Sequence, residues 1–362
     1  MRALIRHELR QLWAIALVFL GFGLFNIYSL YDHIQLYYLG NLRILPVNYT
    51  GTFLLQFMYI YNEYNFVFLI VLLALLVSVQ YKDNKSIGIS HFLGSLPYTQ
   101  KEISSIKILS GVCCYSIYFI VTLVGSIFLR NDVLAWNSSG SAVSIYVDYL
   151  IDGNKLSTLL IQIFILFLAT TTVYLFLTMM QYQVHHFIGS AVIGLLILIS
   201  PLFLIISVQN ILSLVLDYTH PIFTLSSTWV DTIIGFFDAS YRTMRLTDVA
   251  SLRGGYLSIV GIPQFDDFWW LRSLILIGIC LIILCIIIEM NKLYGLGKHE
   301  RMITSPLFEK IFVLGVTICS FFVGIIFSEL INFSTVPAIL ISIVTTIIGF
   351  MISRFICTLG KQ

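Results

Sequence analysis

Charged residues are scarce in this sequence. Asp, Glu, Lys and Arg together make up 10% of the 362 residues, whereas a soluble domain has about 25%. Hydrophobic residues make up 59%, which is more apolar surface than a soluble fold can bury. The composition therefore excludes a soluble globular protein and predicts one whose solvent is lipid. The net charge of +2 is also too small to favour a nucleic acid as partner.

Motifs for metal, disulfide and nucleotide chemistry are missing as well. The six cysteines include no C-x-x-C pair, so neither a zinc site nor a disulfide framework is predicted. A chain that hydrolyses ATP needs a phosphate-binding loop, G-x-x-x-x-G-K-[ST], after a strand. The nearest string, Gly295 to His299, lacks this spacing and the Ser or Thr that holds magnesium. We interpret it as a turn that ends a helix.

Two pairs of titratable residues stand beside apolar runs. His185-His186 lie in a short turn between two runs, and Asp266-Asp267 precede a pair of tryptophans. Both pairs fit solvated edges of membrane spans better than a metal site or a catalytic dyad. The sequence therefore predicts no catalytic and no metal-binding residue.

Apolar runs are abundant. A helix needs about 20 apolar residues to cross the hydrocarbon core of a bilayer. Backbone polar groups find no partners in lipid, so such runs must be helices. The sequence predicts an all-α integral membrane protein with about eight transmembrane helices, at 12–31, 58–80, 105–129, 158–181, 186–208, 270–290, 311–331 and 335–355.

The basic residues predict the orientation. Thirteen of the 20 Lys and Arg residues fall in segments that face the cytoplasm if both termini do. The 131–157 loop, on the other side, carries Asp132, Asp148 and Asp152 against Lys155. Loops rich in Lys and Arg stay in the cytoplasm. We therefore expect both termini, and the polar segment 81–104 between spans two and three, on the cytoplasmic side.

The end of the segment 81–104 carries a helix-start signal. Thr99 and Glu102 have the T-x-x-E spacing of a capping box, and Tyr98 and Ile103 stand where a hydrophobic staple closes across it. A helix is therefore predicted to begin near Gln100 and to continue without a break into the third span.

The middle of the same segment has helical periodicity. Its apolar residues recur at i, i+3, i+4 and i+7, which predicts a short amphipathic helix that ends at Pro97. The apolar face must rest on the membrane surface or on a protein partner. The residues of this face are Ile89, Phe92, Leu93 and Leu96.

The N-terminus combines a basic stripe with an apolar one. Arg2, Arg6 and Arg10 recur every fourth residue, and an apolar stripe with the same spacing runs beside them. One interpretation is a positive cap on the first span, with arginines that reach the lipid headgroups. The other is an interfacial helix, Glu8 included, that lies flat before the span turns into the bilayer.

The segment 209–268 between spans five and six is too long for a simple turn. Its stretch "STWVDTIIGFF" has a Ser/Thr cap candidate followed by an apolar run. This pattern predicts a short helix that dips into the outer leaflet.

Two stretches of the chain resemble the permease subunit of type-2 ABC exporters. They are "RHELRQL" before the first span and "SIGISHFLGSLPYTQKEISSIK" between spans two and three. This sequence departs from the family's pattern at two positions. Asp83 is the nearest counterpart of the family's acidic residue, and Gln100, followed by Lys101, stands in place of its arginine. The matching residues are Gly88, Leu93, Ser95, Leu96, Pro97, Thr99, Glu102, Ile103 and Lys107.

The resemblance implies a division of the chain into two parts. Residues 1–291 would form a six-helix permease core with an N-terminal interfacial helix, a cytoplasmic coupling segment at 81–104 and an outer segment at 209–268. Residues 292–362 would form a C-terminal two-helix extension, which resembles that of the Ytr-like permeases of Gram-positive bacteria. In this family the outer segment carries small re-entrant or gating helices, so we expect 209–268 to close the pathway on the outer side.

The resemblance also implies partners. The chain would pair with a second permease, identical or related, and with two copies of an ABC ATPase in the cytoplasmic membrane of a bacterium. ATP and magnesium would bind to the ATPase, so this chain is expected to be neither an enzyme nor the holder of a cofactor. The coupling interface would comprise Gly88, Ile89, Phe92, Leu93, Leu96, Pro97, Thr99 and Glu102.

The expected cargo follows from the spans, which offer almost no charge to an ionic substrate. We expect outward transport of a hydrophobic or amphipathic molecule, such as an antimicrobial or toxin-like peptide or a lipid. An ion-coupled secondary transporter is the alternative, although such proteins usually carry charges and broken helices at the midplane. A membrane enzyme would need paired Asp, Glu or His at one membrane face, and the sequence offers no convincing set. A non-transporting immunity or sensor protein with the same fold also agrees with the sequence.

Overall fold

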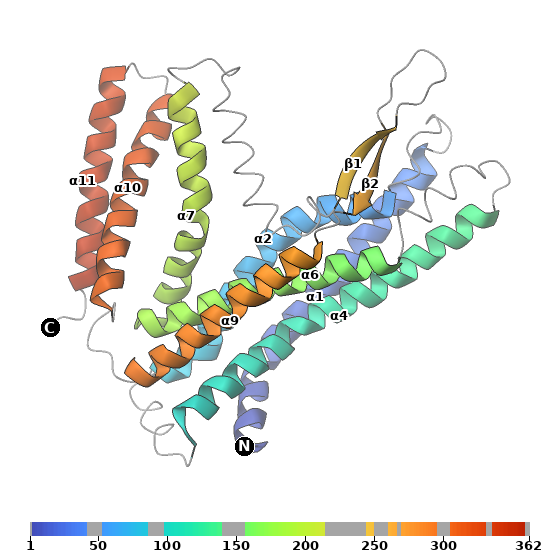
Figure 1. The fold of residues 1–362 in the computed structure, drawn as a ribbon, viewed down its shortest axis with the longest axis horizontal. Helices are drawn as coiled ribbons and strands as arrows, with labels where there is room; N and C mark the ends of the chain where they lie inside the picture. Colours follow the sequence, from blue (N-terminus) through green and yellow to red (C-terminus); the bar gives the residue numbers. More distant parts are fainter. Residues whose placement is uncertain are drawn as a thin grey trace. The chain divides into compact units, whose positions relative to one another are not determined.

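The computed structural model of the chain describes residues 2–41, 53–85, 98–139, 156–213, 244–249, 260–265, 269–294, 305–330 and 335–358. Long helices dominate these residues (Figure 1). They are α1 (Arg2–Asn41), α2 (Phe53–Lys82), α4 (Gln100–Ser139), α6 (Leu156–Gln183), α7 (Phe187–Ser213), α9 (Trp269–Tyr294), α10 (Pro306–Leu330) and α11 (Thr335–Thr358).

Seven of these helices are long and apolar enough to cross a membrane. They coincide with seven of the eight predicted spans, so a multi-pass helical membrane protein is confirmed. The remaining predicted span, 58–80, falls on α2, whose apolar stretch within the described residues is the shorter Phe66–Lys82. The total of eight spans stays a prediction. The seven helices contain the apolar stretches Leu4–Asp32, Gln100–Asn131, Leu159–Gln183, Phe187–Gln209, Trp269–Asn291, Phe308–Phe327 and Ile339–Thr358.

One pair of strands accompanies the helices. β1 (Met244–Val249) and β2 (Val260–Phe265) pair antiparallel, with Met244 opposite Phe265 and Val249 opposite Val260. Both strands belong to the outer segment 209–268, for which a short helix was predicted at 227–237. That stretch lies outside the described residues. The strand pair adds a β element to the predicted all-α fold.

The chain divides into two compact units. The first comprises residues 1–76, 107–174 and 235–282, and the second comprises residues 77–106, 175–234 and 283–362. Helices α2, α4, α6 and α9 contribute residues to both units. This division cuts across the boundary that the family resemblance predicts at residue 291, and that boundary stays a prediction.

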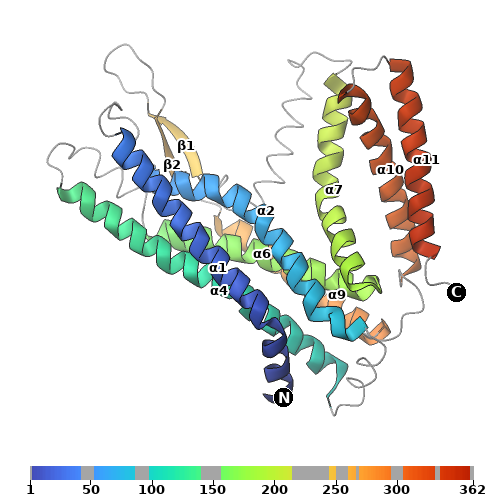
Figure 2. The ribbon, with the colours of Figure 1, turned by 180° about the vertical axis from the view of Figure 1, so that it is seen from behind.

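In the first unit, α1 and α4 run side by side in the same direction (Figures 1 and 2). Asn26 Nδ2 of α1 donates to the Tyr118 hydroxyl of α4 at 2.9 Å. Gly125 of α4 faces the Ile27 side chain so closely that a Cβ would not fit beside it. Small residues let membrane helices approach in this way. The two helices therefore start at the same end of the unit, as the alternating directions of spans one and three require.

Helix α6 packs antiparallel on α4 in the same unit. The Tyr115 hydroxyl lies 2.7 Å from Thr171 Oγ1. One turn further along α4, the rings of Phe119 and Phe167 meet edge to face at 5.3 Å. The hydroxyl of Thr171 also donates to the carbonyl of Phe167 in its own helix, which satisfies a polar group that lipid would leave unpaired.

In the second unit, α7, α10 and α11 stand side by side (Figures 1 and 2). Their common core joins Ile193 of α7, Phe312 of α10 and Cys357 of α11 to Met180 and Val184 at the end of α6. The last two helices, which exceed the predicted permease core, are thus packed against the end of α6.

Helix α7 carries a proline at position 201 without a break. Proline has no N–H, so the carbonyl four residues earlier, that of Ile197, loses its helical donor. The hydroxyl of Ser200 donates to this carbonyl at 2.9 Å. A neighbouring serine therefore supplies the missing hydrogen bond, which is how membrane helices tolerate proline.

Candidate functional site

Four helix ends meet in the second unit. Tyr182, near the end of α6, has its hydroxyl 2.7 Å from Ser104 Oγ in the first turns of α4. The ring of Tyr182 meets that of Tyr81, near the end of α2, at 6.0 Å edge to face. Asn291 Nδ2, near the end of α9, donates to the Gln100 carbonyl at 3.0 Å. We call this cluster the helix-end junction; it consists of Tyr81, Lys85, Gln100, Ser104, Gln181, Tyr182, Val184 and Asn291.

The junction places the described ends of the segment 81–104 on one side of the second unit. Helices α2, α6 and α9 end there, whereas α4 begins there, so α4 runs opposite to the other three. The α6–α7 turn at 184–186 and the end of α9 share this side. This matches the relative directions that alternating membrane spans predict, although the side that faces the cytoplasm stays a prediction.

The capping box at the start of α4 is confirmed. The Thr99 N–H and hydroxyl both donate to Glu102 Oε2, at 2.8 and 2.9 Å, and the Glu102 N–H donates to Thr99 Oγ1 at 3.3 Å. The helix begins at Gln100 and runs to Ser139, as predicted. Ile103, the inner residue of the predicted staple, is buried. Local side-chain chemistry alone therefore fixes where α4 starts.

Loss of the cap should loosen the first turn of α4. We expect Thr99→Ala to raise the hydrogen-exchange rate of the Glu102 amide about fivefold, because the amide loses its hydroxyl acceptor. Thr99→Ser keeps the hydroxyl and should exchange like the unmodified chain. Residue-resolved hydrogen exchange on the chain in nanodiscs measures both. Equal rates in the Ala and Ser variants would show that the hydroxyl does not hold the turn.

Lys85 joins the end of α2 to the end of α6. It closes the 3-10 turn η2 (Asp83–Lys85) that follows α2. Its Nζ donates to the carbonyl oxygens of Gln181 and, at 2.9 Å, Val184. Burial of the amino group lowers the pKa of Lys85 from 10.5 to about 7. A lysine on a polar segment is thus held inside the junction.

The two histidines of the α6–α7 turn have different surroundings. His186 is exposed, and its Nδ1 accepts the Gly189 N–H at 3.1 Å, which caps the start of α7. Burial, then the charges of Lys85 and His186, lower the pKa of His185 below its usual range. Among the described residues, no group of three or more His, Cys, Asp or Glu is placed to hold a metal ion. The prediction that this turn is a polar edge of the spans stays a prediction.

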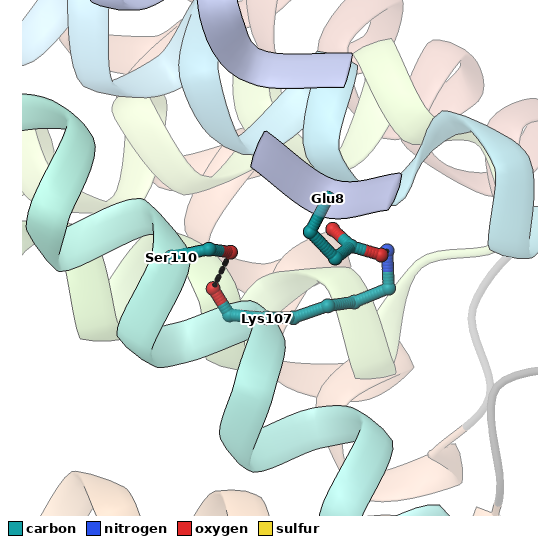
Figure 3. A network of polar contacts seen from close by, with 3 residues as sticks. All are labelled: Glu8, Lys107 and Ser110. Atoms are coloured by element: carbon teal, nitrogen blue, oxygen red, sulfur yellow. Dashed lines mark hydrogen bonds and ion pairs between the residues drawn. The ribbon is translucent and has the colours of Figure 1, made fainter. Parts of the chain in front are cut away.

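A buried ion pair joins α1 and α4 in the first unit (Figure 3). Lys107 Nζ lies 2.8 Å from Glu8 Oε1, and each side chain is 2% exposed. Glu8 Oε2 has no hydrogen-bond partner among the described residues. The Ser110 hydroxyl donates to the Lys107 carbonyl at 2.8 Å. Two opposite charges are thus buried between α1 and α4, and together they carry no net charge.

The residues predicted for the N-terminal helix separate into two sets. Arg6 and Arg10 are exposed, as expected for residues that contact water or lipid headgroups, and Arg2 begins α1. Glu8 belongs instead to the buried face, between Leu4 and Leu12. Helix α1 is continuous and bends near its N-terminal end (Figures 1 and 2). The interfacial role of the arginines stays a prediction.

Most of the predicted coupling interface lies outside the described residues. Of its eight residues, the structure describes Thr99 and Glu102, which form the cap. The other six are Gly88, Ile89, Phe92, Leu93, Leu96 and Pro97. Their contact with an ATPase stays a prediction.

Sequence reasoning missed Lys85 and Asn291 as residues that join helix ends. No local pattern distinguishes Lys85 from the other lysines of its segment. A signal existed for Glu8, because it stands in the helical stripe of Leu4, Leu12 and Ile15, all of which are buried. A carboxylate in an apolar stripe next to a membrane span needs a cationic partner.

Comparison of the chain with protein-family models, with curated proteins and with solved structures gave no match. The resemblance to type-2 exporter permeases therefore rests on the sequence stretches quoted above.

Proposed function

We propose that this chain is the membrane-spanning subunit of an ATP-driven exporter in the cytoplasmic membrane of a bacterium. A separate ABC ATPase, in two copies, supplies the energy, and a second permease, identical or related, completes the pathway. The coupling segment 81–104 lies in the cytoplasm and contacts the ATPase. Closure of the ATPase pushes this segment and opens a route outward between the permeases.

The helix-end junction is the observation that supports this proposal best. A segment that transmits force must be joined stiffly to the helices it moves. The segment 81–104 leaves α2 through a turn bound to α6 by Lys85, and it enters α4 through a capped helix start. The Gln100 carbonyl is bound by Asn291 of α9. Movement of either end of the segment therefore acts on helix ends rather than on a loose loop.

The character of the buried groups supports a cargo without net charge. Hydroxyls in the middle of the helices mostly donate to carbonyls of their own helix, as Thr170 and Thr172 do. The charges of Glu8 and Lys107 neutralise each other. A membrane helix bundle with these groups holds a hydrophobic or amphipathic molecule, such as an antimicrobial or toxin-like peptide or a lipid, more readily than an ion.

Co-purification tests the coupling interface. The chain is expressed with the ABC ATPase encoded beside it, extracted into mild detergent and captured by a tag on the permease. Changing Phe92→Asp together with Leu93→Asp should abolish recovery of the ATPase, because two carboxylates cannot be buried unpaired in an apolar cleft. The variant chain should still insert in the membrane, since these residues lie outside the predicted spans.

Two charges introduced elsewhere on the same predicted amphipathic helix provide the control. Ser90→Asp with His91→Asp adds two carboxylates off the predicted apolar face, and this variant should still recover the ATPase. Retained binding in the Phe92/Leu93 variant contradicts the proposed interface. So does equal loss of binding in the Ser90/His91 variant, which would indicate a general effect of negative charge.

A further inference from the structure

Lys85 lies at the C-terminal end of α6, where the last carbonyls have no backbone N–H donor from a following turn. The last helical hydrogen bond of α6 runs from the Val184 N–H to the Met180 carbonyl. The carbonyls from Gln181 onward therefore lack a donor from the next turn, and they form the negative end of the helix dipole. Lys85 Nζ donates to two of them, those of Gln181 and Val184. A side chain from the 3-10 turn after α2 thus supplies donors that a further turn of α6 would have supplied.

The number of hydrogen bonds suits the neutral amine. A neutral amine has two N–H donors, and Lys85 Nζ has two acceptors. An ammonium group carries a third N–H, for which no acceptor is found among the described residues. Lys85 also has no ion-pair partner there. The carbonyl dipoles favour the ammonium form, but burial without a counterion disfavours it more strongly, so the pKa of Lys85 falls to about 7.

Within the part of the chain that the structure describes, no salt bridge joins Lys85 to a surrounding titratable group. His185 and His186 belong to the turn itself, and His185 is close enough to sense the charge of Lys85. Asp83 stands two residues before Lys85 in the same 3-10 turn. The remaining titratable groups on the adjoining helix ends are either exposed side chains or tyrosines with buried rings. The exposed ones are Lys82, Lys101, Glu102 and Glu289, and the tyrosines are Tyr81 and Tyr182.

We propose that Lys85 is a positioning residue that clamps the α6–α7 turn to the end of α2, and that this clamp tightens as Lys85 gives up its proton. The clamp forms within this chain and requires no partner protein. Its use in transport rests on the proposed function: a push on the coupling segment would then reach α6 and α7 as well as α4.

The direction of the pH effect follows from linkage. The clamped lysine has a pKa of about 7, whereas the released, exposed lysine has the usual 10.5. Between these values the released form binds more protons, so raising the pH favours the clamped form. The equilibrium constant for clamping should rise up to about tenfold per pH unit above pH 7. Below pH 7 both forms are protonated, and the clamp stays weak.

Hydrogen exchange of the turn tests the clamp without any transport assay. The full chain in nanodiscs is exchanged at pH 7.0, 8.0 and 9.0, and the rates of amides in residues 184–190 are corrected for intrinsic chemical exchange. We expect the corrected rates to fall by up to about tenfold per pH unit. His185 loses its proton below pH 7, since its pKa is lowered, and does not contribute to this slope.

Substitutions separate Lys85 from other causes. Lys85→Arg keeps the charge at every pH, and Lys85→Met removes both charge and donor, so both variants should lose the slope. Lys82→Met, an exposed lysine one turn earlier, should keep it. Amides of α4 at 110–118 report whether a variant is folded as the unmodified chain is.

The outcomes decide the proposal. A flat pH profile in the unmodified chain overturns it, and so does a slope that persists in Lys85→Arg. Neither result touches the binding of the ATPase, which the Phe92/Leu93 variant tests separately. Loss of ATPase binding in that variant together with a flat profile here would retain the exporter and discard the clamp. The reverse combination would retain the clamp and discard the exporter.

Discussion

Replacing Glu8 by Met is expected to lower the free energy of unfolding by about 3–5 kcal/mol, because it leaves a buried charge without its partner. Lys107 is 2% exposed and lies 2.8 Å from Glu8 Oε1. Without the carboxylate, its ammonium group loses its ion-pair partner, and α4 is expected to move away from α1. Lys107→Met leaves Glu8 without its ion-pair partner, and Glu8 Oε2 already has no hydrogen-bond partner in the part of the chain that the structure describes.

The double variant Glu8→Met/Lys107→Met should recover most of that loss. Removing both charges removes the cost of burying them, and two methionines fill a similar volume with apolar atoms. Equilibrium unfolding of the full chain in bicelles measures all four members of the cycle, whose coupling energy should be several kcal/mol. Lys101→Met, an exposed lysine at the start of the same helix, serves as the control and should be neutral.

Additive losses in the double variant would contradict this account, because they would mean that each charge is stabilised by groups other than its partner. A coupled result would assign the pair a role in register. The buried pair, like the Asn26–Tyr118 hydrogen bond, fits one alignment of α1 on α4. Specificity of this kind is the best-supported use of buried ion pairs.

The apolar runs predicted most of the fold. Length and hydropathy decide whether a helix spans a bilayer, and both are visible in one sequence. The start of α4 was predicted near Gln100, where it lies, because Thr99 and Glu102 cap the helix through hydrogen bonds three residues apart. Features that depend on local chemistry or on the solvent can therefore be read from the sequence.

The junction and the ion pair could not be read in this way. Lys85 binds carbonyls that lie 96 and 99 residues further along the chain. Backbone acceptors leave no trace in residue identity, so a buried clamp and a solvated lysine look the same in sequence. The strand pair was missed for a different reason. β2 contains Pro263, and a proline argues against a strand unless it lies where no ladder hydrogen bond is needed.

The C-terminal helices also have a structural role that their position beyond the predicted core did not suggest. Phe312 of α10 and Cys357 of α11 share a buried cluster with Met180 and Val184. Val184 is also one of the two residues that Lys85 binds. The last two helices therefore pack against the same end of α6 that Lys85 binds from the turn after α2. Their packing should affect the stability of the helix-end junction.

Gly324→Ala is expected to disrupt this support. The added Cβ would lie 2.6 Å from the Cα and 3.1 Å from the backbone nitrogen of Ser342 in α11. Backbone atoms cannot turn away as a side chain can, so α10 and α11 must separate. Overpacking of this kind costs about 1–3 kcal/mol and occasionally more, and close packing through small residues is what holds membrane helices together.

Gly315 offers a matched control in the same helix. A Cβ there meets nothing within 4 Å, so Gly315→Ala should be neutral or slightly stabilising, since alanine favours a helix over glycine. Melting of the full chain in detergent should show a lower midpoint for Gly324→Ala alone. If α10 and α11 support the end of α6, hydrogen exchange at 184–190 should also rise in this variant and not in the control. A lower midpoint with unchanged exchange there would mean that the last two helices stabilise each other but not the turn that Lys85 binds.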